Sequence, residues 1–264
     1  MRLDVYLAGK GCAESRTRAQ SLIEEGNVLV DGKKITKPSY PMDEQKEYRI
    51  QILSRQKYVS RGGLKLEKAL SVFSLDVSGV CALDVGASTG GFTDCLLQNG
   101  AFRVYAVDSG EGQLALSLRT DPRVVCMEKY NAKNLVKEDF PEPIDFAVMD
   151  VSFISQTLIL PGLSAVLSEE GILVSLVKPQ FEAGRDAIGK NGIVKSTRDR
   201  LRALERVIDC AATWGLSCFG ADFSPICGGD GNVEFIVAFR KGGESAFDRV
   251  NLWELSEKNP ERRK

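Results

Sequence analysis

Hydrophobic positions follow two different patterns along this chain, and the pattern changes near residue 60. In the first part, apolar residues recur at helical spacing over short stretches and then alternate in NVLVDGKKI, residues 27–35. The helical spacing predicts two short amphipathic helices, the second with Ser15 as its N-cap and Gly26 as its end. The alternation, interrupted at Asp31 and Gly32, predicts a β-hairpin. We therefore expect a small N-terminal α+β domain.

Beyond residue 80, short apolar runs alternate with stretches of helical periodicity. The runs are CALDV, FRVYAVD, RVVCMEKY, IDFAVMD, GILVSLVK, LSCFGADF and VEFIVAFR, and helices are expected at 112–119, 155–167 and 197–214. Short apolar strands that alternate with helices predict a mostly parallel, doubly wound α/β sheet of seven strands. The last two strands are joined by ICGGDGN, which is too short for a crossover helix. We therefore expect the seventh strand to be antiparallel.

Composition narrows the class of protein. The chain has 264 residues, of which 43% are hydrophobic, enough for one large domain and a small one. Its apolar runs are much shorter than the roughly 20 residues that cross a bilayer, and its first residues resemble no secretion signal. We therefore expect a cytoplasmic protein without a membrane partner.

Two residue types limit the possible chemistry. The seven cysteines show no CxxC pair, so we expect neither a disulfide framework nor a metal site. The chain contains no histidine, which excludes a Ser-His-Asp triad and histidine-ligated metals. Proton transfer near neutral pH must then use Lys, Asp, Glu, Cys or Tyr.

Charge is distributed unevenly. Residues 1–68 contain 14 Lys and Arg against 9 Asp and Glu, whereas the remainder contains 21 against 27. A basic N-terminal part is typical of polyanion binding, although a modest excess is often only a solvated surface. The candidates for phosphate contacts in this part are Arg2, Lys10, Arg16, Arg18, Lys33, Lys34 and Lys37.

The stretch SRTRAQSLIEEGNVLVDGKKI, residues 15–35, combines an arginine-bearing helix, a glycine stop and a V-D-G turn. It resembles the αL-motif RNA-binding domain of the ribosomal S-four type, here over residues 1–60. The resemblance implies RNA binding. An interaction module that binds no RNA is the alternative reading.

A glycine-rich turn follows the first strand of the second part, in CALDVGASTGGF, residues 81–92. Its spacing, G-x-x-x-G-G, differs from the G-x-G-x-x-G of dinucleotide-binding folds. Asp108 ends the next strand, where an acid can hold the ribose hydroxyls of either a dinucleotide or an adenosyl cofactor. A tight turn that binds nothing is the structural alternative.

The same turn is similar to the first motif of the FtsJ-like S-adenosylmethionine-dependent RNA methyltransferases, D-L-G-A-x-P-G-G-[FW], with Thr89 in place of their proline. The resemblance implies S-adenosylmethionine as the cofactor. Carboxylates and carbonyl groups suit its cationic methyl donor better than the anion-binding turn that a pyrophosphate requires. The cofactor-binding candidates are Asp84, Gly86, Ala87, Ser88, Gly90, Gly91, Phe92, Asp108, Asn131 and Asp150.

Four polar residues are expected at the edge of the sheet where ligands bind in α/β folds. Asp150 and Lys178 end the fourth and fifth strands, Glu234 begins the seventh, and Lys65 lies on a helix before the first. Each taken alone has an ordinary reading as a capping or surface residue. Together they resemble the Lys-Asp-Lys-Glu tetrad of ribose 2′-O-methyltransferases. In this interpretation Lys178 orients or removes the hydroxyl proton, and the carboxylates orient the two lysines.

Both parts together resemble the TlyA family of ribosomal RNA methyltransferases, also labelled hemolysins, over residues 1 to about 242. The resemblance implies an RNA-binding domain at 1–60, a methyltransferase domain at 61–242 and a polar tail at 243–264. It also implies methylation of the 2′-hydroxyl of cytidine in ribosomal RNA of the small subunit and, as in many members of the family, of the large subunit. Arg61 and Arg185 are further RNA-binding candidates, and Phe181 could stack on a base.

Three other functions stay open from the sequence. They are a nicotinamide-dependent oxidoreductase, a non-catalytic ribosome-binding factor and a membrane-damaging hemolysin. The glycine spacing disfavours the first, and no amphipathic or spanning segment favours the third. The oligomeric state is also open.

Overall fold

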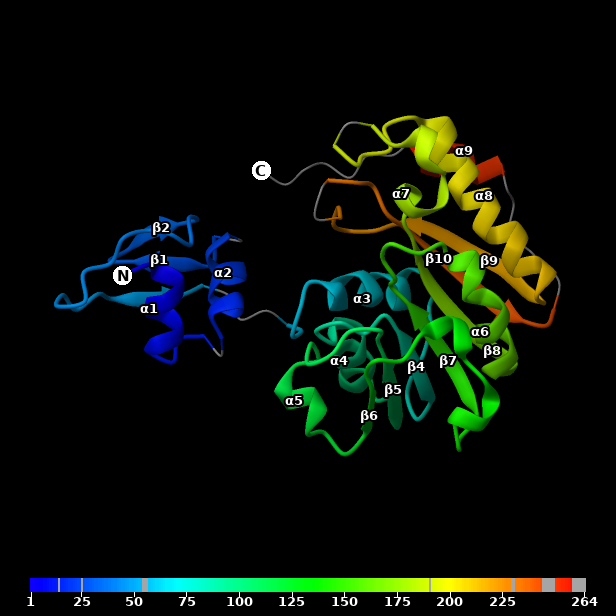
Figure 1. Ribbon diagram of the computed structural model, residues 1–264, viewed down its shortest axis with the longest axis horizontal. Helices are drawn as coiled ribbons and strands as arrows, with labels where there is room; N and C mark the ends of the chain where they lie inside the picture. Colours follow the sequence, from blue (N-terminus) through cyan, green and yellow to red (C-terminus); the bar gives the residue numbers. More distant parts are fainter. Residues whose placement is uncertain are drawn as a thin grey trace. The chain divides into compact units, whose positions relative to one another are not determined.

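The computed structural model describes residues 1–13, 15–24, 26–53, 57–189, 191–228, 231–243 and 250–257. The chain divides into two units, Met1–Lys57 and Tyr58–Lys264 (Figure 1). This division lies close to the boundary that we expected at residue 60.

The N-terminal unit packs two helices on a small antiparallel sheet. Its elements are α1 (Leu3–Gly9), α2 (Arg16–Glu24), β1 (Val28–Val30), β2 (Lys33–Ile35) and β3 (Ile50–Ile52), with sheet order β2-β1-β3. Ser15 caps α2, because its Oγ accepts a hydrogen bond from Arg18 N at 3.1 Å. Asp31 and Gly32 both have positive φ, 50° and 79°, as a two-residue type I′ hairpin turn requires. The predicted helices and hairpin are present, and β3 is an additional strand.

The larger unit contains a seven-stranded sheet with helices on both faces. Its strands are β4 (Cys81–Val85), β5 (Arg103–Val107), β6 (Val124–Met127), β7 (Ile144–Met149), β8 (Leu167–Val177), β9 (Leu216–Phe223) and β10 (Phe235–Lys241). Their order is β6-β5-β4-β7-β8-β10-β9. The pairs from β6 to β8 are parallel, and β10 runs antiparallel to both β8 and β9. The predicted mostly parallel sheet with an antiparallel seventh strand is confirmed.

Alternate residues of the central strands enter two separate hydrophobic cores. On one face, α3 (Gly62–Val72), α4 (Gly91–Gln98) and α5 (Leu116–Arg119) cover side chains such as Ala82 and Val148. On the other, α6 (Leu160–Val166), α8 (Thr197–Thr213) and α9 (Val250–Glu257) cover side chains such as Leu83 and Met149. Figure 1 shows the two helix layers on either side of the sheet. Because both faces are covered, the strands are apolar along almost their whole length.

Two predicted helices are shorter than their sequence pattern suggested. Of the stretch 112–119, only α5 is helical, because Gln113 N and Leu114 N donate to the Glu128 carboxylate at 3.1 and 3.4 Å instead of joining a helix. The stretch 155–167 contains a 3₁₀ turn at Gln156–Leu158 followed by α6. Other short 3₁₀ turns lie at Ala132–Asn134, Lys137–Asp139 and Arg185–Ala187.

Part of the segment that we expected to be a polar tail, 243–264, belongs to the core. Leu252 and Leu255 of α9 are buried against α8. Arg200 of α8 donates from Nη1 to the Ser256 carbonyl oxygen at 3.4 Å. The period of buried leucines, not the average polarity of the segment, decides its packing. Residues 244–249 and 258–264 lie outside the described part of the chain.

Candidate active site

The glycine turn brings three backbone segments into close approach. Gly86 follows β4 with φ of 87°, and a Cβ there would lie 2.5 Å from the carbonyl oxygen of Asp150. A Cβ on Gly91, the first residue of α4, would lie 2.3 Å from Ser60 Oγ. Gly90, at φ of 94°, precedes α4 and faces Leu118 and Leu114 rather than lining either cavity described below. At these three positions a residue larger than glycine would displace its neighbours.

Asp84 is a buried carboxylate with one unused oxygen. It lies on the face of β4 toward α4, where its Oδ2 accepts hydrogen bonds from Thr93 N at 2.9 Å and Thr93 Oγ1 at 2.7 Å. Its Oδ1 has no hydrogen-bond partner among the described residues. Burial raises the pKa of Asp84 to about 7, although the bonds from Thr93 oppose the rise. A cationic donor that reached Oδ1 would supply its missing hydrogen bond and stabilise the ionised carboxylate.

A cavity of about 340 Å³ opens over Asp84 and the turn. The predicted cofactor residues that line it are Asp84, Gly86, Ala87, Ser88, Gly91, Phe92 and Asp150. Ser60, Arg61, Lys65, Ser152, Lys178 and Glu234 complete much of the remaining wall. Its size is in the range of small-molecule sites.

A second cavity, of about 410 Å³, shares Gly86, Ser88, Asp150 and Ser152 with the first. Asp108 lies in its wall and accepts hydrogen bonds from Ser88 N at 2.8 Å and Gly110 N at 2.7 Å. Gln113, Tyr130 and Asn131 line it further. Because the two cavities flank the same turn, one elongated ligand could extend through both.

Four charged side chains converge at the wall of the first cavity. Lys178 Nζ lies 2.6 Å from Asp150 Oδ1. Lys65 Nζ lies 2.6 Å from Glu234 Oε2 and 3.6 Å from Asp150 Oδ2. The structure therefore brings together all four residues of the predicted tetrad, although 169 residues separate Lys65 from Glu234.

The tetrad is largely withdrawn from solvent. Burial opposes the charge on Lys65, but the carboxylates of Asp150 and Glu234 outweigh it and raise its pKa. Lys178, which is 8% exposed, also donates to Ser152 Oγ at 2.8 Å. Two lysines and two carboxylates balance in formal charge, which is the arrangement that buried ions need.

Two phenylalanines lie beyond the strand ends that carry Asp150 and Lys178. Phe153 has a 93% exposed side chain and φ of 63°, which is unusual for an aromatic residue. Its ring centroid lies 5.2 Å from that of the half-buried Phe181. The sequence offered Phe181 either as a stacking residue or as a core residue, and it did not single out its exposed neighbour Phe153.

A buried polar network holds the loops after β7 and β8 together. Glu182 accepts hydrogen bonds from Ser155 Oγ at 2.6 Å and Gln156 N at 2.8 Å. Gln156 in turn donates from Nε2 to the Leu176 carbonyl oxygen at 2.7 Å and accepts from Ser175 Oγ at 2.6 Å. The network fixes the segments on which Asp150, Phe153 and Lys178 are carried.

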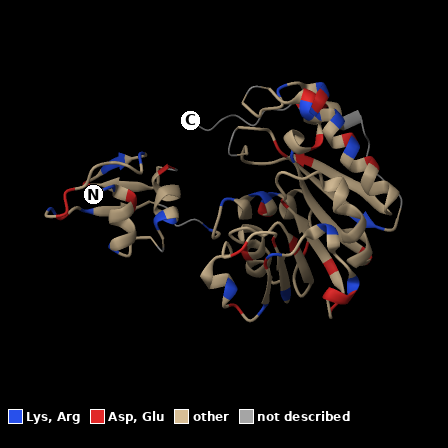
Figure 2. Cartoon of the chain, in the orientation of Figure 1, with Lys and Arg blue, Asp and Glu red and all other residues tan. Residues whose placement is uncertain are grey.

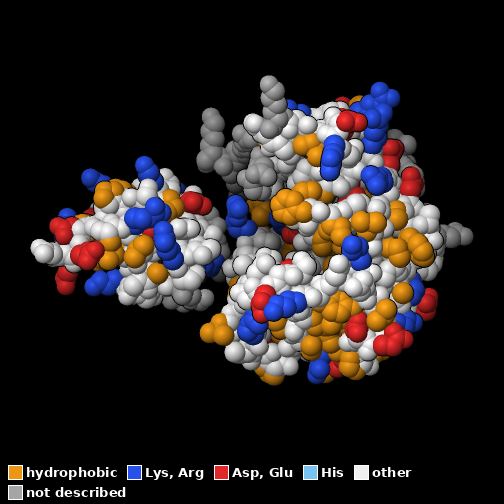
Figure 3. All heavy atoms as spheres, viewed as in Figure 1, with side chains coloured by type: hydrophobic (Ala, Val, Ile, Leu, Met, Phe, Trp, Pro, Cys, Tyr) orange, Lys and Arg blue, Asp and Glu red, His pale blue; other side chains and the backbone are white. Residues whose placement is uncertain are grey.

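The predicted RNA-binding residues fall into two groups. Arg61 lines the first cavity, and Arg185 is exposed in the loop after α7 (Pro179–Glu182) without lining either cavity. The other seven lie in the N-terminal unit, at the two ends of α1, on α2 and around the hairpin. Figure 2 shows the basic residues of this unit in blue. Six of these seven are exposed and Arg18 is half-buried. Basic side chains reach the surface on the face of this unit seen in Figure 3.

Sequence reasoning missed several residues that line the cavities. Ser152 and Phe153 directly follow Asp150 in DVSF, so their position after a strand end was an available signal. Ser60 and Gln113 come from loops whose approach to the turn depends on the packing of α3 and α5. No local pattern marks these two.

Comparison with known proteins identifies both units. The profile of FtsJ-like methyltransferases matches residues 58–241, and the profile of the S4 domain matches residues 1–47. The putative rRNA methyltransferase YqxC of Bacillus subtilis is 47% identical over 244 residues, covering 92% of this chain and 86% of that protein. The Mycobacterium tuberculosis protein named 16S/23S rRNA (cytidine-2′-O)-methyltransferase TlyA is 41% identical over 251 residues, covering 95% and 94%.

A solved structure is similar over nearly the whole chain. A putative hemolysin from Streptococcus thermophilus superposes with a TM-score of 0.78 at 45% identity, covering 97% of this chain and 94% of that one. Within the part of the chain that the structure describes, no helix is both long and apolar enough to cross a membrane. The predicted methyltransferase fold, its cofactor S-adenosylmethionine and the resemblance to TlyA proteins are thereby confirmed. The chain belongs to the FtsJ-like methyltransferase family, among the members that carry an N-terminal S4 domain.

Proposed function

We propose that this S-adenosylmethionine-dependent methyltransferase methylates the ribose 2′-hydroxyl of a cytidine in ribosomal RNA. The observation that carries the proposal is the convergence of Lys65, Asp150, Lys178 and Glu234 at the wall of the cavity that contains Asp84. The name of the Mycobacterium tuberculosis relative supports a cytidine in small- and large-subunit RNA. A ribosomal substrate makes the cytoplasm the expected location.

The residues of the two cavities fit the cofactor. Asp84 Oδ1 would accept from the ammonium group of the methionine moiety, and Asp108 would accept from the ribose hydroxyls. Asn131 and Tyr130 would border the adenine, while the backbone at Gly86 allows close approach. When bound, S-adenosylmethionine supplies an activated methyl group on a sulfonium. No metal is assigned to the reaction.

Lys178 is the side chain that we assign to the 2′-hydroxyl. Its Nζ faces the cavity, where it can orient the hydroxyl. Once Lys178 has released its own proton to solvent, the neutral amine can receive the hydroxyl proton as the oxygen attacks the methyl carbon. Asp150, at 2.6 Å, stabilises the ammonium that results. Lys65 bridges Asp150 and Glu234, so it holds Asp150 in place. Alignment of the hydroxyl with the methyl group supplies a further share of the rate.

RNA recognition is divided between the two units. Exposed basic residues of the N-terminal unit contact phosphates, and Arg61 contacts the backbone near the target. The target nucleotide must leave its helix to bring its ribose into the cavity. The exposed ring of Phe153, supported by Phe181, is suited to stack on its base.

The test is transfer of labelled methyl from S-adenosylmethionine to separated ribosomal subunits from cells that lack this modification. We expect label at one or more cytidine 2′-oxygens with wild type, and at least a 100-fold lower rate with Lys178→Ala, because positioned proton transfer contributes roughly 10²–10⁴-fold. The matched control is Lys68→Ala, which removes another ion-paired lysine, 2.9 Å from Asp222 and outside both cavities. The control should keep its rate within about threefold of wild type, as surface and peripheral changes generally do.

Two results would contradict the proposal. If Lys178→Ala transfers methyl at the wild-type rate, the tetrad does not act on the hydroxyl. If neither subunit accepts label although the protein binds S-adenosylmethionine, ribosomal RNA is not the methyl acceptor, and a non-catalytic ribosome-binding role becomes the better reading.

A further inference from the structure

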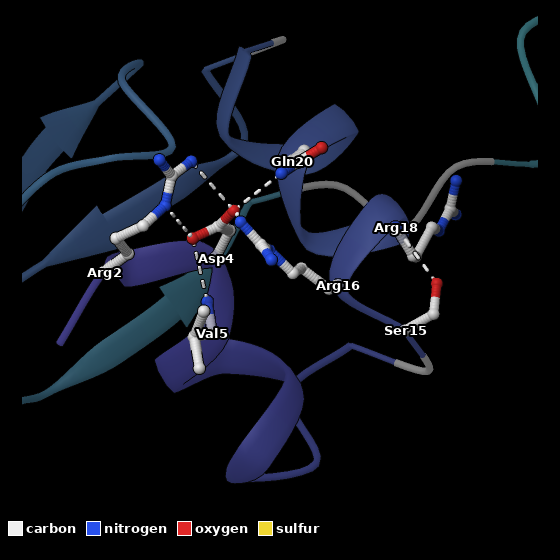
Figure 4. Close-up of polar contacts among 7 residues, drawn as sticks. All are labelled: Arg2, Asp4, Val5, Ser15, Arg16, Arg18 and Gln20. Atoms are coloured by element: carbon white, nitrogen blue, oxygen red, sulfur yellow. Dashed lines mark hydrogen bonds and ion pairs between the residues drawn. The ribbon is translucent and has the colours of Figure 1, made fainter.

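Asp4 is a fully buried carboxylate at the start of α1 that gathers three side chains around itself. Arg2 donates to it from Nε at 2.9 Å and from Nη2 at 3.1 Å. Arg16 donates from Nε at 3.0 Å and Gln20 from Nε2 at 2.6 Å, both from α2. Figure 4 shows the three side chains meeting at the one carboxylate. Val5 N completes the set at 3.0 Å.

Both arginines remain accessible although they are held. Their side chains are 46% and 57% exposed, whereas Asp4 is 0% exposed. Within the described residues, Arg2 Nη1 and both terminal nitrogens of Arg16 donate to no protein group. A guanidinium carries five donors in a planar fork, so these free donors can bind phosphate oxygens while Nε stays on Asp4.

Backbone hydrogen bonds connect the start of α1 to the segment after β2. Asp4 N donates to the Pro38 carbonyl oxygen at 3.1 Å, and Leu3 N donates to that of Tyr40 at 2.9 Å. The segment that follows Lys37 is therefore fixed to the start of α1.

Two energetic considerations favour a role for Asp4 in RNA binding over a purely structural ion pair between the two helices. A negative charge near an RNA-binding surface weakens binding unless it serves another purpose, because it repels phosphates. Immobilising a long arginine side chain also costs roughly 1.5–2 kcal/mol of rotamer entropy, which a pre-formed contact removes from the binding step. Asp4 is buried away from the surface, and it holds two exposed guanidinium groups in place. The benefit of positioning these groups would therefore offset the repulsion of phosphate by its charge.

We propose that Asp4 is a positioning residue for RNA, which holds Arg2 and Arg16 as a pre-formed pair of phosphate-binding groups. The inference rests on the proposed function, because it takes the N-terminal unit as an RNA-binding surface. The hydrogen bonds that Asp4 accepts, the one from Arg2 above all, hold its pKa below its ordinary value and outweigh its burial, which opposes the charge. The carboxylate therefore stays charged at the pH of the cell.

The test measures binding of the full-length protein to purified ribosomal subunits and compares two opposed expectations for Asp4→Asn. Removal of one negative charge alone would tighten RNA binding. Loss of positioning weakens it, and we expect the dissociation constant to rise about 10-fold, the value of roughly one charge-assisted hydrogen bond to phosphate. The turnover number at saturating subunit concentration should not change. Gln20→Leu is the matched control, because it removes a partner of Asp4 but no cation, and we expect unchanged RNA affinity.

A double-mutant cycle separates positioning from folding. In a protein that already carries Arg2→Ala and Arg16→Ala, Asp4→Asn should cause no further loss of RNA affinity. An additive loss there would overturn the inference, as would unchanged or tighter binding by a folded Asp4→Asn protein. If Asp4→Asn does not fold, the Arg2→Lys, Arg16→Lys protein tests the same point, because it keeps both charges and loses the planar fork. We expect the same 10-fold loss from it, and wild-type affinity would overturn the inference.

The premise that the N-terminal unit binds RNA through Arg2 and Arg16 can be tested separately from the role of Asp4. If Arg2→Ala with Arg16→Ala leaves RNA affinity unchanged, the proposed RNA surface is wrong and the role of Asp4 is wrong with it. If these changes weaken binding and Asp4→Asn does not, only the role of Asp4 is wrong. The effect of Lys178→Ala on the rate of methyl transfer is measured independently of either result.

Discussion

Asp4 in the N-terminal unit and Asp84 in the methyltransferase unit are both fully buried aspartates in opposite surroundings. Asp4 is surrounded by donors from two arginines and a glutamine, which lower its pKa. Asp84 has donors only from Thr93, keeps one oxygen without a partner among the described residues, and has its pKa raised to about 7. The first carboxylate has its cations within the protein. The second has the surroundings of a site whose cation comes from a ligand.

The accessible groups differ accordingly. Around Asp4, the protein's own cations reach solvent, which suits contact with a polyanion. Beside Asp84, the lysines are withdrawn and neutralised by Asp150 and Glu234. A buried acid therefore indicates function only when its partners, and the atoms left without partners, are examined.

Replacing Asp84 should have the largest effect of the changes that test this comparison of Asp84 with Asp4, and the effect should be on cofactor affinity. Asp84→Asn keeps the hydrogen bonds from Thr93 but removes the charge facing the cavity. We expect S-adenosylmethionine to bind about 10- to 100-fold more weakly, because a hydrogen bond to a charged group is worth roughly 1.5–3 kcal/mol. Calorimetric titration measures the change, and Asp4→Asn serves as the control with unchanged cofactor affinity. Equal affinities of wild type and Asp84→Asn would mean that Asp84 does not meet the cofactor.

A smaller effect should appear with pH. A cation stabilises the ionised form of Asp84, so cofactor binding releases a proton wherever the free site is protonated. Affinity should therefore fall as the pH drops through 7, to about one tenth of its high-pH value at pH 6, since one pH unit corresponds to 1.36 kcal/mol. Titrations at several pH values measure this slope, which should be absent from Asp84→Asn. A flat profile for wild type would show that Asp84 is already ionised in the free protein.

The smallest effect is on the pH dependence of folding, and it has opposite signs in the two units. The pKa of Asp84 is raised on folding from 3.8 to about 7, so its contribution to stability is full below pH 3.8 and is lost as the pH rises through 7. The pKa of Asp4 is lowered from 3.8, so its contribution is present above that value and is lost at more acidic pH.

Thermal unfolding between pH 7.5 and 3 measures this difference. Wild type should gain a few degrees in the melting temperature of the methyltransferase unit relative to Asp84→Asn as the pH falls from 7.5 to 5.5, because about 1 kcal/mol shifts a unit of this size by roughly 2–4 °C. The N-terminal unit should lose stability only below about pH 4. The same pH trend in wild type and Asp84→Asn would remove Asp84 as the cause.

Particular elements show what sequence reasoning can and cannot reach. The hairpin at Asp31 and Gly32 was predictable because a two-residue turn is specified by its own residues. Strand β3 was missed because it forms only by pairing with β1, about 20 residues earlier. The helix expected at 112–119 is shorter because Glu128, directly after the next strand, accepts hydrogen bonds from the N–H groups that would have begun it.

The candidate site shows the same division. The strand ends placed Asp150, Lys178 and Glu234 at one edge of the sheet, and the family resemblance grouped them with Lys65 as a tetrad. The distances among their side chains, the exposure of Phe153 and the unpartnered oxygen of Asp84 could not be predicted. Each of these depends on contacts between segments far apart in the chain.

The sequence by itself determined the two-unit order, the parallel sheet with its antiparallel seventh strand, the methyltransferase family and the residues able to do chemistry. These follow from periodicity, loop length and short motifs, which are local properties. Only the tertiary structure decided that Asp4 is surrounded by cations and Asp84 is not, and that four charges meet in one cavity. Burial and the identity of neighbours set the energy of a charge, and the fold alone brings neighbours together across more than a hundred residues.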